Sequence, residues 1–184
     1  TSDLDKAIRS MIEKGTWPNL EFIVVENNSE KTYTFTYYEK IQTEFPNVKV
    51  VRYDGDFNYS KINNYGVSFT KGEYILLMNN DVELISPDSL KEMMGYCQRE
   101  DVGVVGARLL YEDNTIQHAG VVIGINGIAD HVFKSEEEHT TYFSRALIAQ
   151  DYSAETAAVM LVKKSIFESV NGLDEKFAVA FNDI

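Results

Sequence analysis

The chain has 184 residues, 44% of them hydrophobic and 25% charged, values that predict one soluble globular domain with a core of its own. Its formal net charge of -12 argues against a nucleic-acid backbone or an anionic membrane surface as a direct partner, because both require a positive protein surface. Cys97 is the single cysteine of the sequence, which excludes an intramolecular disulfide and a cysteine zinc cluster. The sequence contains no run of 18 apolar residues, so it predicts no transmembrane span.

Strand and helix patterns alternate along the first 110 residues. Apolar runs rich in β-branched residues predict strands at residues 20–25, 47–53, 72–78 and 101–109. The helical spacing of apolar residues predicts helices at residues 4–12, 30–44, 58–69 and 86–99. The last of these helices is expected to have Ser86 as its cap and Pro87 at its first position. This alternation predicts an α/β domain with a largely parallel sheet and right-handed connections.

The pattern changes in the second part of the chain. Residues 115–127, "TIQHAGVVIGING", predict a short pair of strands with glycine turns. The polar residues 130–150 predict an excursion or a mobile loop, and residues 157–170 predict a strand followed by a short helix. No internal repeat, low-complexity tract or linker divides the sequence, so we expect a single domain over residues 1–184.

Polar side chains follow two of the predicted strands and recur at the end of the chain. Glu26, Asn27 and Asn28 follow the first strand, Asn79, Asn80 and Asp81 follow the third, and Asn182 and Asp183 stand near the C-terminus. Asparagine and aspartate also form turns, so each cluster has a purely structural alternative. Ligands of open α/β sheets bind at the carboxyl ends of the strands, and two clusters at such ends favour a site there.

Asp81 is the candidate metal ligand of these clusters. Hard cations such as Mg²⁺ take oxygen ligands, often only one or two carboxylates together with phosphate oxygens. A metal that bridges two phosphates would explain how an acidic protein holds a diphosphate. Glu83 is a weaker candidate, because a turn after the strand would expose it to solvent.

The histidines and the absent motifs narrow the function further. The spacings of 13 and 8 residues between His118, His131 and His139 do not match a zinc site, and the default interpretation of His118 is structural. Cys97 is expected only to pack inside a helix. The sequence has no GxGxxG, GxxxxGK[ST] or GxSxG, which disfavours dinucleotide binding, a P-loop NTPase and an α/β hydrolase.

Four segments in the same order resemble the motifs of the family 2 glycosyltransferases of the GT-A type. "TWPNLEFIVVENNS" is similar to "TYPNLEIIVVDNGS", and "NNYGVSFTKGEYILLMNND" is similar to "ARNxGxxxAxGEYIxFLDxDD". "ETAAVMLVKKSIFESVNGLDEKF" is similar to "GAxxLVRRxxFExVGGFDExF", and "FNDI" matches the start of the family's "ED" motif. The resemblance covers about residues 4–184. It implies the GT-A fold of nucleotide-diphospho-sugar transferases, in which helices flank a mostly parallel mixed sheet.

The resemblance implies inverting transfer of a sugar from a nucleoside diphosphate sugar to an acceptor hydroxyl, with Mn²⁺ or Mg²⁺ as cofactor. A metal ion stabilises the charge that gathers on the diphosphate leaving group, and a carboxylate takes the proton of the attacking hydroxyl. By this resemblance the catalytic base is Asp183, the metal ligand is Asp81, and the nucleotide-binding residues are Glu26, Asn27, Asn64 and Asn80.

The resemblance also implies the setting of the reaction. Residues 1–110 would form the nucleotide-binding half and residues 111–184 the acceptor-side half. The expected acceptor is a glycan or a lipid-linked glycan of bacterial polysaccharide or glycoconjugate synthesis, with no nucleic acid as partner. The expected location is the cytoplasm, including the inner face of the membrane.

Departures from the family pattern leave alternatives open. The usual acidic pair is "ENN" here, and Asn79 replaces the leading aspartate of the metal motif, so the metal site is expected to be weaker unless phosphate completes it. The family's first strand would precede Thr1, so we expect two unpaired strand edges and little or no activity from this segment alone. One alternative is a non-catalytic sugar-nucleotide or glycan-binding module of the same fold. A nucleotidyltransferase is weaker, because no glycine-rich phosphate loop bearing Arg or Lys is visible.

Overall fold

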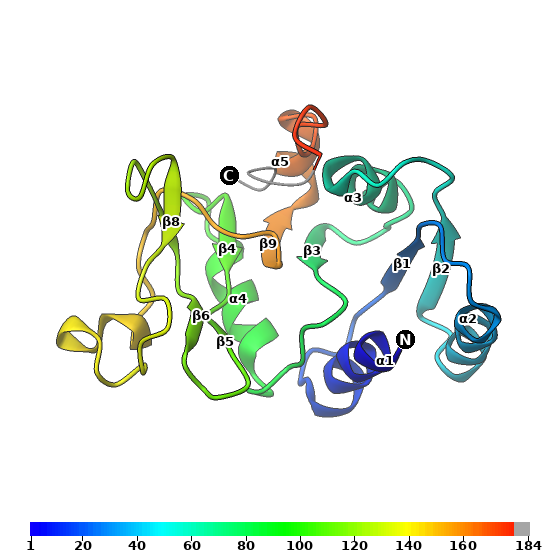
Figure 1. Cartoon of the computed structure of the whole chain (residues 1–184), viewed down its shortest axis with the longest axis horizontal. Coiled ribbons are helices and arrows are strands. Elements are labelled where there is room, and N and C mark those ends of the chain that lie inside the picture. Colours follow the sequence, from blue (N-terminus) through cyan, green and yellow to red (C-terminus); the bar gives the residue numbers. More distant parts are fainter. Residues whose placement is uncertain (179–184) are drawn as a thin grey trace.

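A computed structural model describes residues 1–178 of the chain (Figure 1). The strands are β1 (Phe22–Glu26), β2 (Val48–Arg52), β3 (Tyr74–Met78), β4 (Val104–Gly106), β5 (Leu109–Leu110), β6 (Ile116–His118), β7 (Val121–Ile123), β8 (Ala129–His131) and β9 (Val159–Lys163). The helices are α1 (Ser2–Arg9), α2 (Thr32–Glu44), α3 (Tyr59–Val67), α4 (Ser89–Cys97) and α5 (Lys164–Ser169), with a π-helical turn η1 (Ser10–Lys14) and a 3₁₀ helix η2 (Tyr142–Leu147). The strands and helices predicted for the first 110 residues are thereby confirmed, apart from their ends.

The start of α4 differs from the prediction. The helix begins at Ser89 with Asp88 as its cap. Ser86 lies in the turn before the helix, and its carbonyl oxygen accepts a hydrogen bond from the Ser89 N–H at 3.1 Å. The Pro87 carbonyl oxygen instead accepts from the Thr16 N–H at 3.1 Å, and the Asp88 carboxylate accepts from the Thr16 hydroxyl at 2.8 Å. Contacts with a distant loop therefore delay the helix by two residues, which the local sequence could not reveal.

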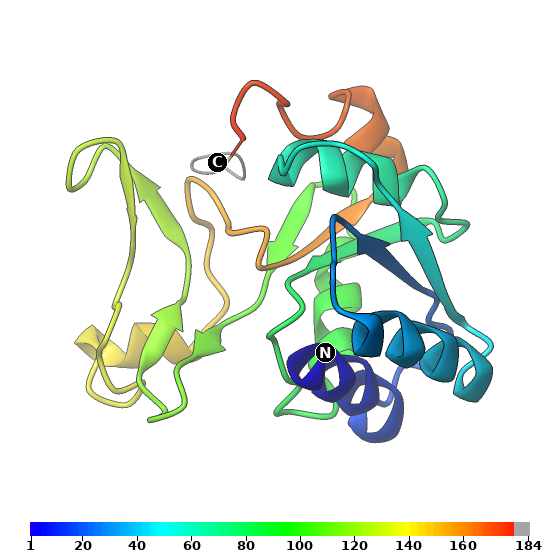
Figure 2. The ribbon, with the colours of Figure 1, turned by 45° about the vertical axis from the view of Figure 1, so that its right-hand side comes forward.

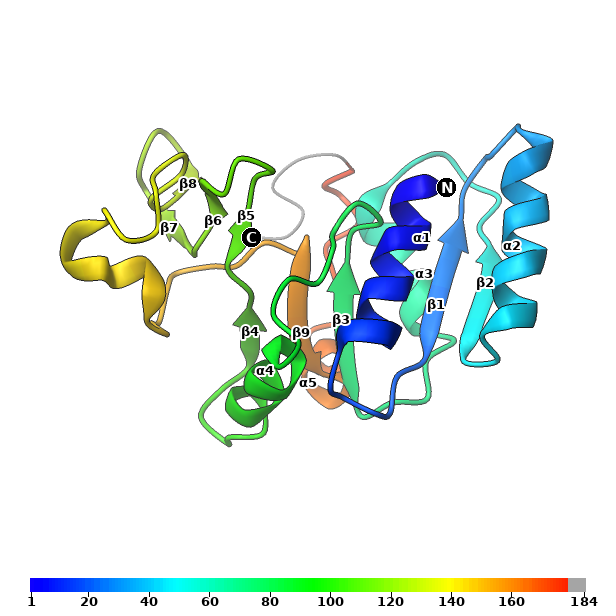
Figure 3. The ribbon, with the colours of Figure 1, turned by 90° about the horizontal axis from the view of Figure 1, so that it is seen from below.

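The central strands form a mixed arrangement. β1 and β2 are parallel, with Phe22 opposite Val48, whereas β9 runs antiparallel to both β3 and β4 and lies between them. Within residues 1–178, the only strand paired with β1 is β2, and the only strand paired with β3 is β9. Both β1 and β3 therefore have one edge without a paired strand, as expected. In Figure 3, α1 lies between β1 and β3 on the near face of the strands, and α3 lies on their far face.

The core occupies both faces of the β3–β9–β4 sheet. Because side chains alternate along a strand, Ile75 and Leu77 face one side, where they pack with Val67 of α3 and Phe167 of α5. The other side packs against α4 and includes Leu161 and Cys97. Cys97 is fully buried, and burial raises the pKa of its thiol, so the expectation that it only packs fits its surroundings.

Residues from β5 to η2 form a lobe on one side of the molecule (Figure 2). The predicted strand pair at residues 115–127 is wrong in its pairing, because β6 pairs with β5 and β7 pairs with β8. Gly120 lies between β6 and β7 with a φ of +116°, a left-handed conformation that turns the chain away from a direct hairpin. The excursion predicted at residues 130–150 holds part of β8 and the helix η2. Among residues 1–178, no helix is both long and apolar enough to cross a bilayer.

Candidate functional site

The carboxyl end of β3 carries the candidate metal ligand. The Asn79 N–H donates to the Ala158 carbonyl oxygen at 2.9 Å, which extends the pairing of β3 with the β9 side by one residue. After this anchor the chain leaves the sheet, and the side chains of Asn80 and Asp81 are exposed. The β3 strand therefore delivers Asp81 to the surface at the carboxyl edge of the sheet, where the sequence predicted a site.

Glu83, the weaker candidate for a metal ligand, forms an ion pair with another residue. Its carboxylate lies 2.6 Å from the Lys14 ammonium of η1, and both side chains are about half exposed. This ammonium lowers the pKa of Glu83 below its ordinary value. The ion pair ties η1 to the loop after β3 and engages Glu83, whereas Asp81 is a second exposed carboxylate of this loop.

The residues present could hold a metal ion only if the protein supplied few of its ligands. No group of three or more His, Cys, Asp or Glu side chains among residues 1–178 could enclose a cation. A magnesium or manganese ion needs no such enclosure when substrate phosphates supply most of its ligands. The exposed Asp81 carboxylate suits this arrangement, in which the metal and the diphosphate would bind together.

The carboxyl end of β1 is built around two asparagines. The Asn27 amide donates to the carbonyl oxygens of Tyr53 at 3.1 Å and Gly55 at 2.8 Å, and the Asn28 amide donates to Gly55 at 2.9 Å. Asn28 has a φ of 55°, a left-handed conformation that asparagine tolerates better than most residues. Both side chains thus fix the loop after β2, and an aspartate could not donate these bonds. The departure from the family's acidic pair has a local structural reason.

Glu26 shapes the same turn. Its side chain is 3% exposed, and one carboxylate oxygen accepts from the Ser29 N–H at 2.6 Å. The other oxygen has no hydrogen-bond partner among the described residues and lies 3.8 Å from the Arg52 guanidinium. The buried carboxylate therefore orders the loop that presents Asn27, and its contact with a nucleotide remains a prediction.

We expect Asn27→Asp to lower the free energy of unfolding by about 1–3 kcal/mol at pH 7. The introduced carboxylate cannot donate, and it would face the carbonyl oxygens of Tyr53 and Gly55. Urea denaturation followed by circular dichroism measures the change. Asn19→Asp is the matched control, because Asn19 is exposed in the turn before β1. Equal stability of the two variants would contradict the role given to the Asn27 amide.

Asn64 lies on α3 and binds the turn after α5. Its amide group donates to the Leu173 carbonyl oxygen at 2.9 Å, and its oxygen accepts from the Leu173 N–H at 2.9 Å. A second donor bond reaches the Glu175 carboxylate at 3.2 Å. Gly172 has a φ of +73°, and a side chain there would overlap the Asn64 amide. Asn64 thus holds the turn that follows α5, and its contact with a nucleotide remains a prediction.

Asp183 and Asn182, predicted near the catalytic centre, lie outside the described residues. Figure 3 shows β1 and β3 pointing in the same direction, so Asn27 and Asp81 follow strand ends at the same edge of the fold. Asn64 binds the turn after α5, which precedes Asp183 in the sequence. The structure therefore places Glu26, Asn27, Asn80 and Asp81 at two strand ends on one edge of the fold, whereas Asn64 lies on α3, and several of these residues have structural partners.

The structure also joins three side chains that the sequence did not connect. His118, predicted to be structural, contacts both His131 and Glu155 through its ring nitrogens. These residues come from β6, β8 and the segment before β9, and no local spacing links them. Only the folded chain brings them together.

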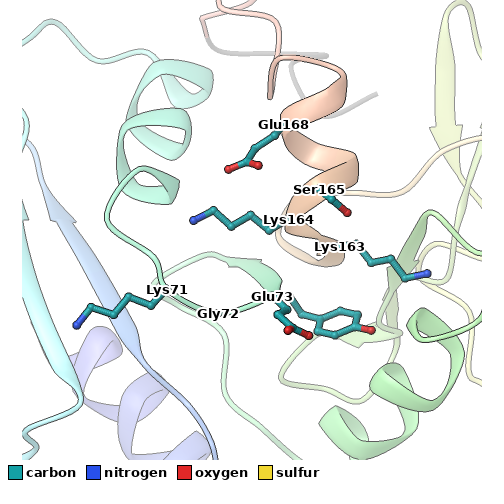
Figure 4. A pocket seen from close by; sticks show the side chains of 8 residues that line it. Lys71, Gly72, Glu73, Lys163, Lys164, Ser165 and Glu168 are labelled. Carbon is teal, nitrogen blue, oxygen red and sulfur yellow. The ribbon is translucent and has the colours of Figure 1, made fainter.

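A surface pocket of about 400 Å³ lies away from these residues (Figure 4). It is lined by Lys71, Gly72, Glu73, Tyr74, Lys163, Lys164, Ser165 and Glu168. Tyr74 pairs with Lys163 at one end of the β3–β9 ladder, whereas Met78 and the candidate site are at the other end. The ammonium groups of Lys163 and Lys164 donate to the carbonyl oxygens of Arg99 and Thr70, at 2.7 and 2.8 Å. The pocket is therefore not the predicted nucleotide site.

Comparison with known proteins gives a family match and relatives. The model of "Glycosyl transferase family 2" matches residues 2–166. "Uncharacterized protein y4gI" of Sinorhizobium fredii (strain NBRC 101917 / NGR234) is 44% identical over 183 residues, 98% of this chain and 20% of that protein. "O-antigen biosynthesis protein RfbC" of Myxococcus xanthus is 35% identical over 179 residues, 96% of this chain and 14% of that protein. The chain thus spans a fifth or less of the length of these curated relatives.

A solved structure has a similar fold. The mannosyltransferase PcManGT from Pyrobaculum calidifontis, in complex with GDP-Man and Mn²⁺, superposes with a TM-score of 0.68. The match covers 99% of this chain and 46% of that protein, at 15% sequence identity. At this identity the likeness concerns the fold, which is a GT-A-like arrangement of helices and a mixed sheet.

Proposed function

The chain belongs to glycosyl transferase family 2, and from that premise we propose that it carries out inverting transfer of a sugar from a nucleoside diphosphate sugar to an acceptor hydroxyl. The observation that carries the proposal is the carboxyl end of β3. There a hydrogen bond anchors Asn79, and the exposed Asp81 carboxylate follows two residues later. An exposed carboxylate at a strand end suits a diphosphate held through a metal ion, and the fold neighbour was solved with GDP-Man and Mn²⁺.

The donor would bind along the edge that joins the ends of β1 and β3. Asn27 and Glu26 order the loops at the end of β1, and Asn80 lies next to the diphosphate position at the end of β3. Asp81 would hold a Mn²⁺ or Mg²⁺ ion, which stabilises the negative charge of the departing diphosphate when bound. Asn64 holds the turn after α5 and so shapes the approach to this edge.

The acceptor hydroxyl must lose its proton as it attacks the sugar. We assign this proton to the Asp183 carboxylate, on the strength of its position in the "FNDI" motif. Inversion follows when the hydroxyl attacks from the side opposite the leaving group in one step. The acceptor is a glycan or a lipid-linked glycan, and the relative named for O-antigen biosynthesis supports a role in bacterial polysaccharide synthesis. The cytoplasm, including the inner membrane face, is the location that such substrates favour.

Nucleotide binding tests the proposal directly. We expect GDP or UDP to bind in isothermal titration calorimetry with one site per chain, and to bind more tightly when Mn²⁺ or Mg²⁺ is present. Donor consumption in the presence of a glycan acceptor then tests transfer itself. The absence of binding by GDP, UDP and the other common nucleoside diphosphates, with either metal, would refute a sugar-nucleotide site in this chain, whether catalytic or not.

A further inference from the structure

A short segment of the lobe, residues 142–148, exposes four large apolar side chains to solvent. Their exposed fractions are 72% for Tyr142, 83% for Phe143, 40% for Leu147 and 61% for Ile148. The rings of Tyr142 and Phe143 also contact each other, with their centroids 4.6 Å apart. Single apolar side chains on a surface need no explanation, whereas four within seven residues mark an interaction surface. We call these four residues the apolar tip.

The backbone of this segment is held in a rare conformation. Phe143 and Ser144 have φ angles of 51° and 52°, in the left-handed region that residues with a side chain seldom adopt. The carbonyl oxygen of the buried Thr141 accepts from the Ser144 N–H at 2.7 Å, and the Ala146 carbonyl oxygen accepts from the Arg108 guanidinium at 3.1 Å. Such strain persists only where the surrounding structure enforces it, and it is concentrated at functional surfaces. The exposure of the apolar tip is therefore built into the fold.

The charges around the apolar tip differ from those of the whole chain. The chain has 29 acidic residues, yet residues 139–150 contain no Asp or Glu and include the basic residue Arg145. Among the glutamates just before this stretch, Glu138 pairs with Arg108 at 3.0 Å, and the backbone of Glu136 is hydrogen-bonded to β6. A surface with aromatic and aliphatic side chains, a basic residue and no carboxylate matches the interface between the headgroups and the acyl chains of a phospholipid bilayer.

The apolar tip lies at the outer end of the lobe. In Figures 1 and 3 the yellow segment that contains η2 is at the end of the molecule opposite α2. A projecting segment can enter a bilayer interface without the rest of the chain. The formal net charge of -12 would oppose adsorption of the whole surface to anionic lipids. Attachment would therefore depend on burial of apolar side chains and not on long-range attraction.

We propose that the apolar tip inserts into the interface of a phospholipid bilayer and attaches the chain reversibly to a membrane surface. The rings of Tyr142 and Phe143 suit the level of the headgroups, where aromatic side chains are enriched. Leu147 and Ile148 add aliphatic area that lipid would cover. The inference concerns a surface of the lobe and does not depend on the transfer reaction, so lipid binding and nucleotide binding are separate properties.

Co-sedimentation of the chain with phosphatidylcholine vesicles at millimolar lipid tests the proposal. We expect reversible binding, and we expect the double variant Phe143→Ser/Ile148→Ser to bind lipid about tenfold more weakly. Tyr33→Ser/Ile85→Ser is the matched control, because it also removes one aromatic and one isoleucine side chain, which are 58% and 68% exposed on α2 and in the loop after β3. Thermal unfolding followed by circular dichroism checks that both double variants fold as the unaltered chain does.

Vesicles that contain phosphatidylglycerol separate insertion from charge attraction. Because the chain is acidic, we expect weaker binding to these vesicles at low salt and recovery at about 0.15 M salt, where the repulsion is screened. Tighter binding to phosphatidylglycerol that both double variants share would overturn the proposal, since charge alone would then hold the chain.

Three further outcomes would overturn the inference: no binding to any vesicle, an equal loss in the control, and a dimer without lipid binding that Phe143→Ser/Ile148→Ser dissociates. The dimer, measured by analytical ultracentrifugation, would assign the apolar tip to a second copy of the chain. Titration of GDP into the same samples reports on the proposed function separately. Intact GDP binding without vesicle binding would overturn the inference alone, and vesicle binding without nucleotide binding would leave it standing.

Discussion

In a chain extended at both ends, Asp183→Asn is expected to lower kcat of sugar transfer by about 10²–10⁴-fold and to leave nucleoside diphosphate affinity almost unchanged. The attacking hydroxyl must lose its proton in the transition state, and an asparagine amide cannot accept that proton. The donor, in contrast, would be held by groups on other parts of the edge. The loss should therefore appear in the turnover number rather than in the dissociation constant of the nucleotide.

Steady-state transfer assays and calorimetric titration of GDP or UDP measure the two quantities. Asp151→Asn is the matched control, because Asp151 is an exposed aspartate in the segment between η2 and β9. An unchanged kcat in Asp183→Asn would contradict the assignment of the base. If binding were intact and neither the variant nor the unaltered protein transferred sugar in the extended chain, the non-catalytic binding module would become the better description.

The fold could largely be predicted from the sequence because its signals are local. Runs such as residues 74–78 are apolar and bounded by turn residues, so their strands appear in the structure within a few residues of the prediction. The Ser86 cap failed because Thr16, far away in sequence, competes for the groups at the start of α4. The pairing of β6 and β7 failed because three-residue strands carry too few residues to specify a partner.

The place of the candidate residues at two strand ends was predictable from the sequence, but their contacts were not. Residue types at the strand ends indicated the carboxyl edge, and the structure places Asn27 and Asp81 after those strands. The amide bonds of Asn27 and Asn64 were not predictable, because their partners lie 26–28 and 109–111 residues away in sequence. Those bonds explain why asparagine suits position 27, where the family pattern has an acid. The contacts of His118 with His131 and Glu155 were missed for the same reason, since β6, β8 and the segment before β9 supply these three residues.

Asp81→Asn is expected to remove most of the dependence of nucleotide binding on metal. In the unaltered protein, Mn²⁺ should tighten GDP or UDP binding, because Asp81 would hold the ion and the ion would offset the charge of the phosphates. In the variant, the affinity measured with Mn²⁺ should fall at least about tenfold, towards the value measured with EDTA. The metal-free affinity itself should hardly change, since it reports contacts with the base and ribose. Transfer activity should fall with the loss of metal-assisted stabilisation of the leaving group.

Glu83→Gln is the control for this prediction. Glu83 lies two residues from Asp81 in the same loop, and removing its charge changes the local potential by the same amount. Its carboxylate is bound to Lys14 at 2.6 Å, so it should contribute no metal ligand. A strong loss of metal dependence in Glu83→Gln would show that charge near the loop, rather than coordination by Asp81, attracts the ion. If Asp81→Asn kept the metal dependence of nucleotide binding, phosphate and other groups would be sufficient to bind the ion. The Asp81 carboxylate at the end of β3 would then be dispensable for metal binding.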